Sequence, residues 1–153
     1  MFADLHLHTH FSDGTFSPEE VAKRAEAVGL SAVALTDHDT VDGCLRMGLA
    51  CAENGIEFIS GCEFTVEQGD RELHLLGYCF NLEDVELQDA LLKYQEVRRK
   101  RVHEMVVLLN GQGISLKVEQ VLELADCEAP GRPHIGRALV ESGHCSNLDE
   151  AFR

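Results

Sequence analysis

The stretch Asp4-Leu5-His6-Leu7-His8 decides the fold, and it belongs to an alternating apolar and polar segment that begins at Phe2. Such alternation predicts a short strand in which every second side chain lies on the same face. His6 and His8 are therefore expected to point the same way. This spacing lets two imidazoles bind one metal ion without distorting the backbone.

Helices and further strands follow this segment in regular alternation. Residues 17–20 read Ser-Pro-Glu-Glu, a capping box with proline at the first helical position, and Gly29 ends the predicted helix. Residues 32–36 form an apolar strand pattern, 41–54 a second helical pattern and 56–60 a third strand. Strands separated by helices at this spacing pair in parallel, so the sequence predicts an α/β fold.

The region after residue 60 changes character twice. Residues 63–67 and 71–79 flank the turn signal Gln68-Gly69-Asp70 and are predicted to pair as a hairpin, which places Glu63 and His74 on neighbouring strands. From about Leu82 the pattern is helical. We therefore divide the chain into 1–81, which carries the sheet, and 82–153, a helical insertion or subdomain.

Composition narrows the classes of protein. With 153 residues, 44% of them hydrophobic, the chain can form one ordinary globular core, and no apolar stretch approaches the roughly 20 residues that span a bilayer. No leader precedes the first strand, so a cytoplasmic protein without membrane contact is expected. The six cysteines form no C-x-x-C pair and are predicted to be free thiols in the core. A net charge of -14 argues against binding to duplex DNA.

Metal-ligating side chains lie at or just beyond the predicted carboxyl ends of several strands. Because those ends meet at one edge of a parallel sheet, we expect the side chains to converge there. A mixed set of imidazoles and carboxylates suits Mn, Fe or Zn, and a carboxylate can bridge two ions. The candidate metal ligands are His6, His8, Asp13, His38, Glu63 and His74.

These segments, taken as a set, resemble the successive motifs of the PHP (polymerase and histidinol phosphatase) superfamily. The matching motifs are Asp4-Leu5-His6-Leu7-His8, Ser12-Asp13-Gly14, Thr36-Asp37-His38-Asp39, Gly61-Cys62-Glu63 and His74-Leu75-Leu76-Gly77-Tyr78. The resemblance implies a distorted (β/α)7 barrel, of which this chain is the N-terminal half with a helical insertion. It also implies up to three divalent metal ions held by the candidate ligands, with Glu63 bridging.

The segment Gly131-Arg132-Pro133-His134-Ile135 is similar to the branch that contains 3′,5′-nucleoside bisphosphate phosphatases and 5′-end RNA exonucleases. That similarity implies that Arg132 and His134 contact substrate phosphates. The chemistry of a guanidinium beside a helix start agrees with it, although a capped, solvent-facing helix start is an equally good interpretation. The basic run 98–101 is interpreted as a solvated helix face.

The predicted reaction is hydrolysis of a phosphate monoester, from a small nucleotide or an RNA 5′ end, by metal-activated water, with Glu63 and His38 acting in catalysis. Alternatives are a histidinol phosphate type of PHP phosphatase, a polymerase-associated exonuclease, or a non-catalytic metal-binding module. His10 is left as a residue that supports the ligands, and His103 and His144 are read as structural.

The end of the chain carries one more expectation. A helix that begins near Asn147 stops after about two turns, and PHP relatives continue with another histidine and an Asp-x-His pair that reach the metals. No Asp-x-His pair follows residue 81. The chain is therefore expected to form a partial barrel that holds fewer ions more weakly, hydrolyses esters slowly or not at all, and associates through its uncovered edge.

Overall fold

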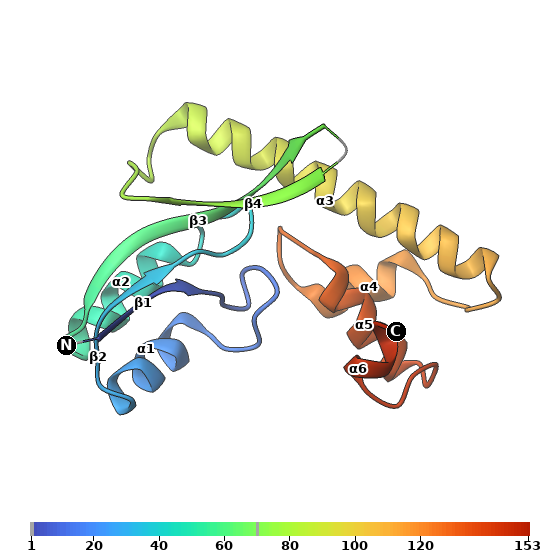
Figure 1. The fold of residues 1–153 in the computed structure, drawn as a ribbon, viewed down its shortest axis with the longest axis horizontal. Coiled ribbons are helices and arrows are strands. Elements are labelled where there is room, and N and C mark those ends of the chain that lie inside the picture. Colours follow the sequence, from blue (N-terminus) through green and yellow to red (C-terminus); the bar gives the residue numbers. More distant parts are fainter. Residues whose placement is uncertain (1, 70) are drawn as a thin grey trace.

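A single curved sheet forms the first part of the chain (Figure 1). The computed structural model describes residues 2–69 and 71–153, so Asp70 of the predicted turn lies outside the described residues. The first three strands are parallel, and the last pairs antiparallel with the third. In sheet order the strands are β1 (Phe2–Leu7), β2 (Leu30–Leu35), β3 (Glu57–Gln68) and β4 (Arg71–Tyr78).

Strand β3 is longer than the sequence analysis predicted. Residues 56–60 and 63–67 were expected to be separate strands, but they belong to one strand of 12 residues. Its first four residues pair with β2, and the remaining eight pair with β4. Gly61 permits the change of partner, because a Cβ there would lie 2.8 Å from the carbonyl oxygen of Leu35. The predicted break was therefore a close approach of two backbones, which only glycine accommodates.

Helices α1 (Pro18–Ala27) and α2 (Cys44–Glu53) lie together against the sheet (Figure 1). The capping box of α1 forms as predicted, with Ser17 and Glu20 each accepting the other's backbone N–H. Helix α2 begins three residues later than predicted because Val41 belongs to a turn that Gly43 ends. Buried side chains of both helices and the sheet form the first core, including Ala22, Val33, Leu35, Met47 and Cys51.

Helix α3 (Val85–Gly111) connects the sheet to the helical part of the chain (Figure 1). Leu87 and Leu91 near its start pack with the first core, whereas Val102 and Val106 belong to a second core. The second core also contains residues of α4 (Val118–Ala125) and α5 (Arg132–Glu141), and α6 (Leu148–Ala151) packs against α5. The division at residue 81 stays a prediction, since α3 contributes to both cores.

All six cysteines are free, as expected. Cys44, Cys51 and Cys62 are buried in the first core, but Cys79 is exposed and corrects the expectation that they all lie inside. Cys79 follows β4 in a left-handed backbone conformation with a φ of 60°, which turns the chain towards α3. No helix within the described residues is both long and apolar enough to cross a membrane.

Candidate metal centre

The structure brings all six predicted metal ligands together. They form three overlapping groups in which the candidate ligand atoms lie within 4.8 Å of one another. The groups are His6, His8 and Glu63; His8, Asp13 and His38; and His38, Glu63 and His74. Because each group shares a member with the next, the six side chains make one continuous donor cluster.

Glu63 lies at the centre of this cluster, and its residue is only 4% exposed. Its Oε2 lies 2.8 Å from His6 Nε2 and 3.0 Å from His8 Nε2, while its Oε1 lies 2.8 Å from His74 Nδ1. Burial opposes ionisation, but the hydrogen bond from His6 and the surrounding imidazoles outweigh it and lower the pKa of Glu63. An ionised carboxylate with both oxygens facing imidazoles has the arrangement of a bridging ligand.

The position of Glu63 differs from the predicted strand end. It lies in the middle of β3, just past the point where β2 has ended, and an isolated parallel bridge pairs it with His38. The Glu63 N–H donates to the Asp37 carbonyl at 3.2 Å, and the Asp39 N–H donates to the Glu63 carbonyl at 3.1 Å. Convergence therefore comes from the edge of the parallel sheet, while β3 itself continues into the hairpin.

Asp37 fixes the loop that carries Asp13. Its carboxylate accepts the Thr9 N–H at 2.7 Å, the Thr9 hydroxyl at 2.6 Å and the Ser12 hydroxyl at 2.7 Å. These bonds hold the chain next to Asp13, whose oxygens lie 3.3 Å from His8 Nδ1 and 3.7 Å from His38 Nε2. Asp37 had no predicted role, although an acidic residue directly after a buried apolar strand was the available signal.

Asp39, on the other side of His38, ties the site to α3. Its carboxylate accepts the Thr65 N–H and hydroxyl, each at 2.8 Å, and pairs with the Arg98 guanidinium. Gln95 of α3 donates to the Asp39 carbonyl at 3.0 Å. The two aspartates that flank His38 thus anchor it from opposite sides, one to the Asp13 loop and one to the hairpin and helix.

His38 has the properties of a neutral ligand. Burial, followed by the positive charge of Arg98, lowers its pKa to about 4. Its buried Nδ1 has no hydrogen-bond partner within the described residues and lies 3.7 Å from Glu63 Oε2. A buried polar nitrogen without a partner is rare in folded proteins. A cation between the cluster donors would satisfy this lone pair, so the residues present fit a metal centre.

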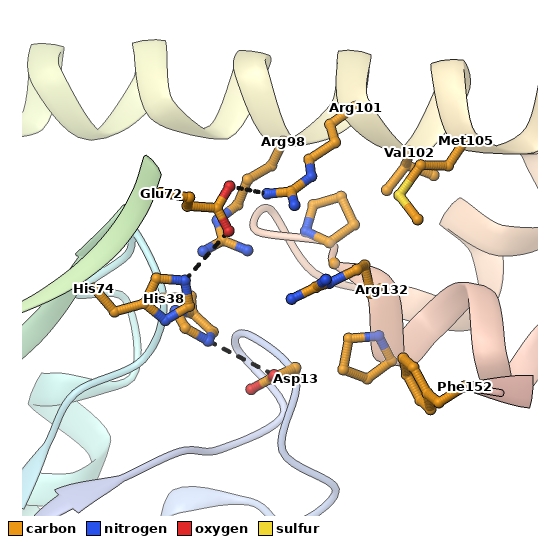
Figure 2. Close-up of a pocket in the computed structure, with 13 residues that line it drawn as sticks. Asp13, His38, Glu72, His74, Arg98, Arg101, Val102, Met105, Arg132 and Phe152 are labelled. Atoms are coloured by element: carbon orange, nitrogen blue, oxygen red, sulfur yellow. Dashed lines mark hydrogen bonds and ion pairs between the residues drawn. The ribbon is translucent and has the colours of Figure 1, made fainter. Parts of the chain in front are cut away.

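A pocket of about 340 Å³ opens beside the cluster. Asp13, His38 and His74 form one wall, and Arg98 and Arg101 of α3 lie opposite, with Arg132 at the start of α5 (Figure 2). The interpretation of residues 98–101 as a solvated face is therefore wrong for two of them. Arg98 and Arg101 are three positions apart, so they share a helix face, which was the signal for their common direction.

Arg132 and His134 occupy different environments, although both were predicted to face phosphates. Arg132 is exposed and lines the pocket, and its guanidinium makes no hydrogen bond or ion pair with another described residue. His134 is 1% exposed, and its Nδ1 accepts the Gly131 N–H at 3.0 Å, so it caps the start of α5 and does not line the pocket. The structure places it behind the segment that carries Arg132.

The three remaining histidines lie outside the donor groups. His10 packs its ring against Phe11, 4.8 Å between centroids, in a separate hollow. His103 is exposed on α3, and His144 is an exposed residue whose Nε2 lies 3.1 Å from the Ser115 carbonyl. None of these three histidines belongs to a donor group, and their roles stay predictions.

Comparison with known proteins identifies the family to which this geometry belongs. The sequence model of the PHP domain family matches residues 4–142, which is most of the chain. The chain belongs to the PHP domain family. This confirms the resemblance that the five motifs indicated, and the expected fold class is confirmed by the similarity to solved structures. One of these, from Bifidobacterium adolescentis and assigned as a metal-dependent phosphoesterase, is 30% identical, covers 99% of this chain and 54% of its own, and has a TM-score of 0.89.

Two curated PHP relatives match almost the whole chain. The 5′-3′ exoribonuclease of Haemophilus influenzae is 37% identical over 150 residues, 98% of this chain and 54% of that protein. The 3′,5′-nucleoside bisphosphate phosphatase of Chromobacterium violaceum is 34% identical over 151 residues, 98% of this chain and 53% of that protein. The chain thus spans about half the length of both relatives.

Proposed function

We propose that this PHP domain contributes the metal centre of a phosphoesterase that hydrolyses a phosphate monoester, from a 3′,5′-nucleoside bisphosphate or an RNA 5′ end. One observation carries the proposal: a cluster of four imidazoles and two carboxylates faces a pocket whose opposite wall holds three arginines. Metal ligands beside arginines, of which Arg132 has no carboxylate partner among the described residues, suit an anionic ester. The names of the two curated relatives support the substrate class.

The donor set suggests which metals bind. His6, His8, His38 and His74 would supply nitrogen, and Asp13 and Glu63 would supply oxygen. This mixture suits Mn, Fe or Zn better than a thiolate-preferring ion, because no cysteine belongs to any of the donor groups. Divalent ions held there would lower the pKa of water to about 7 and neutralise charge on the phosphoryl group.

The protein's own side chains then bind and orient the ester. Arg132, whose guanidinium has no partner among the described residues, would donate to phosphate oxygens. Arg98 and Arg101 add positive charge but are already paired with carboxylates, so they shape the pocket more than they bind. Glu63 would orient the attacking water, and His38, which burial keeps neutral, would act in catalysis through the ion that its lone pair holds.

The experiment combines metal analysis with a substrate panel. Protein purified without chelator is assayed for bound metal and for phosphate release from a 3′,5′-bisphosphonucleotide, its 2′,5′-isomer, histidinol phosphate and short 5′-phosphorylated RNA. His8→Ala and Glu63→Ala are expected to lose metal and hydrolysis while remaining folded. His103→Ala, an exposed histidine outside the cluster, is the matched control and should keep both.

The outcomes separate the alternatives. Preference for the bisphosphonucleotide or the RNA end supports the proposed substrate class, while preference for histidinol phosphate would replace it. Metal binding without turnover on any ester would refute hydrolysis by this chain and leave it only a metal-binding role. Retention of full metal and activity by His8→Ala would show that the donor cluster is not the metal centre.

A further inference from the structure

Glu72 and His74 are neighbours on one face of β4. They are two positions apart in the strand, so their side chains point the same way. Glu72 Oε1 lies 3.6 Å from His74 Nε2 (Figure 2). Glu72 belongs to none of the three donor groups, so this carboxylate stands behind the metal cluster and not within it.

The two ring nitrogens of His74 therefore face different carboxylates. Nδ1 lies 2.8 Å from Glu63 Oε1, at the centre of the donor cluster, whereas Nε2 faces Glu72. A neutral imidazole carries one proton, and a carboxylate beside one nitrogen favours the proton there. A cation in the cluster would take the Nδ1 lone pair in place of the Glu63 contact, and Glu72 would then hold the proton on Nε2.

Glu72 is itself held by the helical part of the chain. Its Oε2 pairs with the Arg101 guanidinium of α3, while its Oε1 faces His74. Figure 2 shows the three side chains in sequence, from α3 through Glu72 to the imidazole. Both oxygens of one carboxylate are engaged, so the orientation of Glu72 is set from two sides.

We propose that Glu72 is a positioning residue for His74, and that Arg101 acts on the metal centre through Glu72. Metal-bound histidines commonly direct their second ring nitrogen to a carboxylate, and loss of that partner typically weakens metal binding by roughly tenfold to a hundredfold. The inference rests on the proposed function only in taking His74 as a metal ligand. It assigns to α3 a role in metal affinity besides its role in packing.

Arg101 provides a test in which two explanations differ in sign. Removal of a positive charge beside a cation site strengthens metal binding if only long-range electrostatics matters. Removal of the residue that holds Glu72 weakens it. Binding of Mn²⁺ and Zn²⁺ to the metal-free chain is measured by competition with a chromophoric chelator. Arg101→Gln is expected to weaken binding, and tighter binding would overturn the proposal. Arg101→Lys, which retains the charge, should keep most of the affinity and covers the case in which Arg101→Gln fails to fold.

Glu72 variants test the contact itself. Glu72→Ala is expected to weaken metal binding by roughly tenfold to a hundredfold, and Glu72→Gln, which keeps an acceptor oxygen, should recover part of the loss. The matched control is Glu67→Ala, since Glu67 is exposed, lies directly opposite Glu72 in the hairpin, and removes the same charge. Equal losses of metal affinity in Glu67→Ala and Glu72→Ala would show that only the removed negative charge matters, which would overturn the proposal.

Nitrogen-15 NMR of the metal-free protein gives a readout that packing alone would not change. In the metal-free parent chain Glu63 at Nδ1 and Glu72 at Nε2 compete for the His74 proton, so the fraction protonated on Nε2 should fall in Glu72→Ala. Arg101→Gln should have little added effect in the Glu72→Ala background, because it acts through Glu72. His74→Ala separates the two proposals. Unchanged metal affinity in His74→Ala would refute the assignment of the metal centre. Weaker metal binding in His74→Ala, together with unchanged binding in the Glu72 variants, would refute only the role of Glu72.

Discussion

Replacing Arg98 by alanine should destabilise the whole chain more than its place in a basic helical run suggests. The Asp39 carboxylate that Arg98 pairs with is fully buried, and the Arg98 side chain itself is 12% exposed. Removing one partner of a buried pair costs about 3–5 kcal/mol, because the other charge stays buried without compensation. Two Thr65 donors at 2.8 Å remain on Asp39, so the low end, about 3 kcal/mol, is expected.

The measurement is urea unfolding of the metal-free protein at neutral pH, with the change taken from the transition midpoint at constant slope. Lys100→Ala is the matched control. It lies on the same helix, and its ion pair with Glu104 is exposed, so its removal should cost less than about 0.5 kcal/mol. Asp39→Asn added to Arg98→Ala should recover part of the loss, because the buried group is then uncharged.

A loss in the free energy of unfolding for Arg98→Ala no larger than that for Lys100→Ala would refute this prediction. That result would mean that the Asp39 carboxylate reaches water or is neutral, and that the hairpin does not depend on α3 for this charge. A large loss that Asp39→Asn does not relieve would point to lost packing of the Arg98 stem and not to the charge.

Three further predictions concern His38, Arg132 and Gly61. Because the pKa of His38 is lowered to about 4 in the folded protein, the unfolded chain binds this proton first as the pH falls. The stability of the metal-free protein should therefore fall between about pH 6.5 and about pH 4 and then level off. His38→Asn should flatten this part of a pH series of urea midpoints. Arg132→Ala should raise the KM or lower the kcat for the phosphate ester at unchanged metal content. Unchanged kinetics across the substrate panel would mean that Arg132 points into solvent and does not contact the substrate. Gly61→Ala should cost about 1–3 kcal/mol in urea unfolding, since its Cβ would meet backbone, whereas Gly111→Ala, with open space around it, should not destabilise.

Local patterns were sufficient for most elements of this protein. The H-x-H alternation predicted β1, the capping box predicted the start of α1, and the apolar run after residue 29 predicted β2, because each depends on residues close in sequence. The six candidate ligands were also accessible from sequence, since their motifs were predicted to meet at one edge of the sheet. The structure brings them together, although Glu63 and His74 lie within β3 and β4. Their action as ligands stays a prediction.

The sequence alone was enough to predict the order of strands and helices and to select the six candidate donor residues. The contacts that hold these residues in place could be seen only in the folded structure. Arg98 and Arg101 resembled a solvated run until the packing of α3 placed them against Asp39 and Glu72. It also placed His134 inside the protein and Arg132 at the pocket. Such contacts join residues about 30 to 60 positions apart, and no periodic pattern records them, because burial and charge pairing depend on which faces meet after the chain has folded.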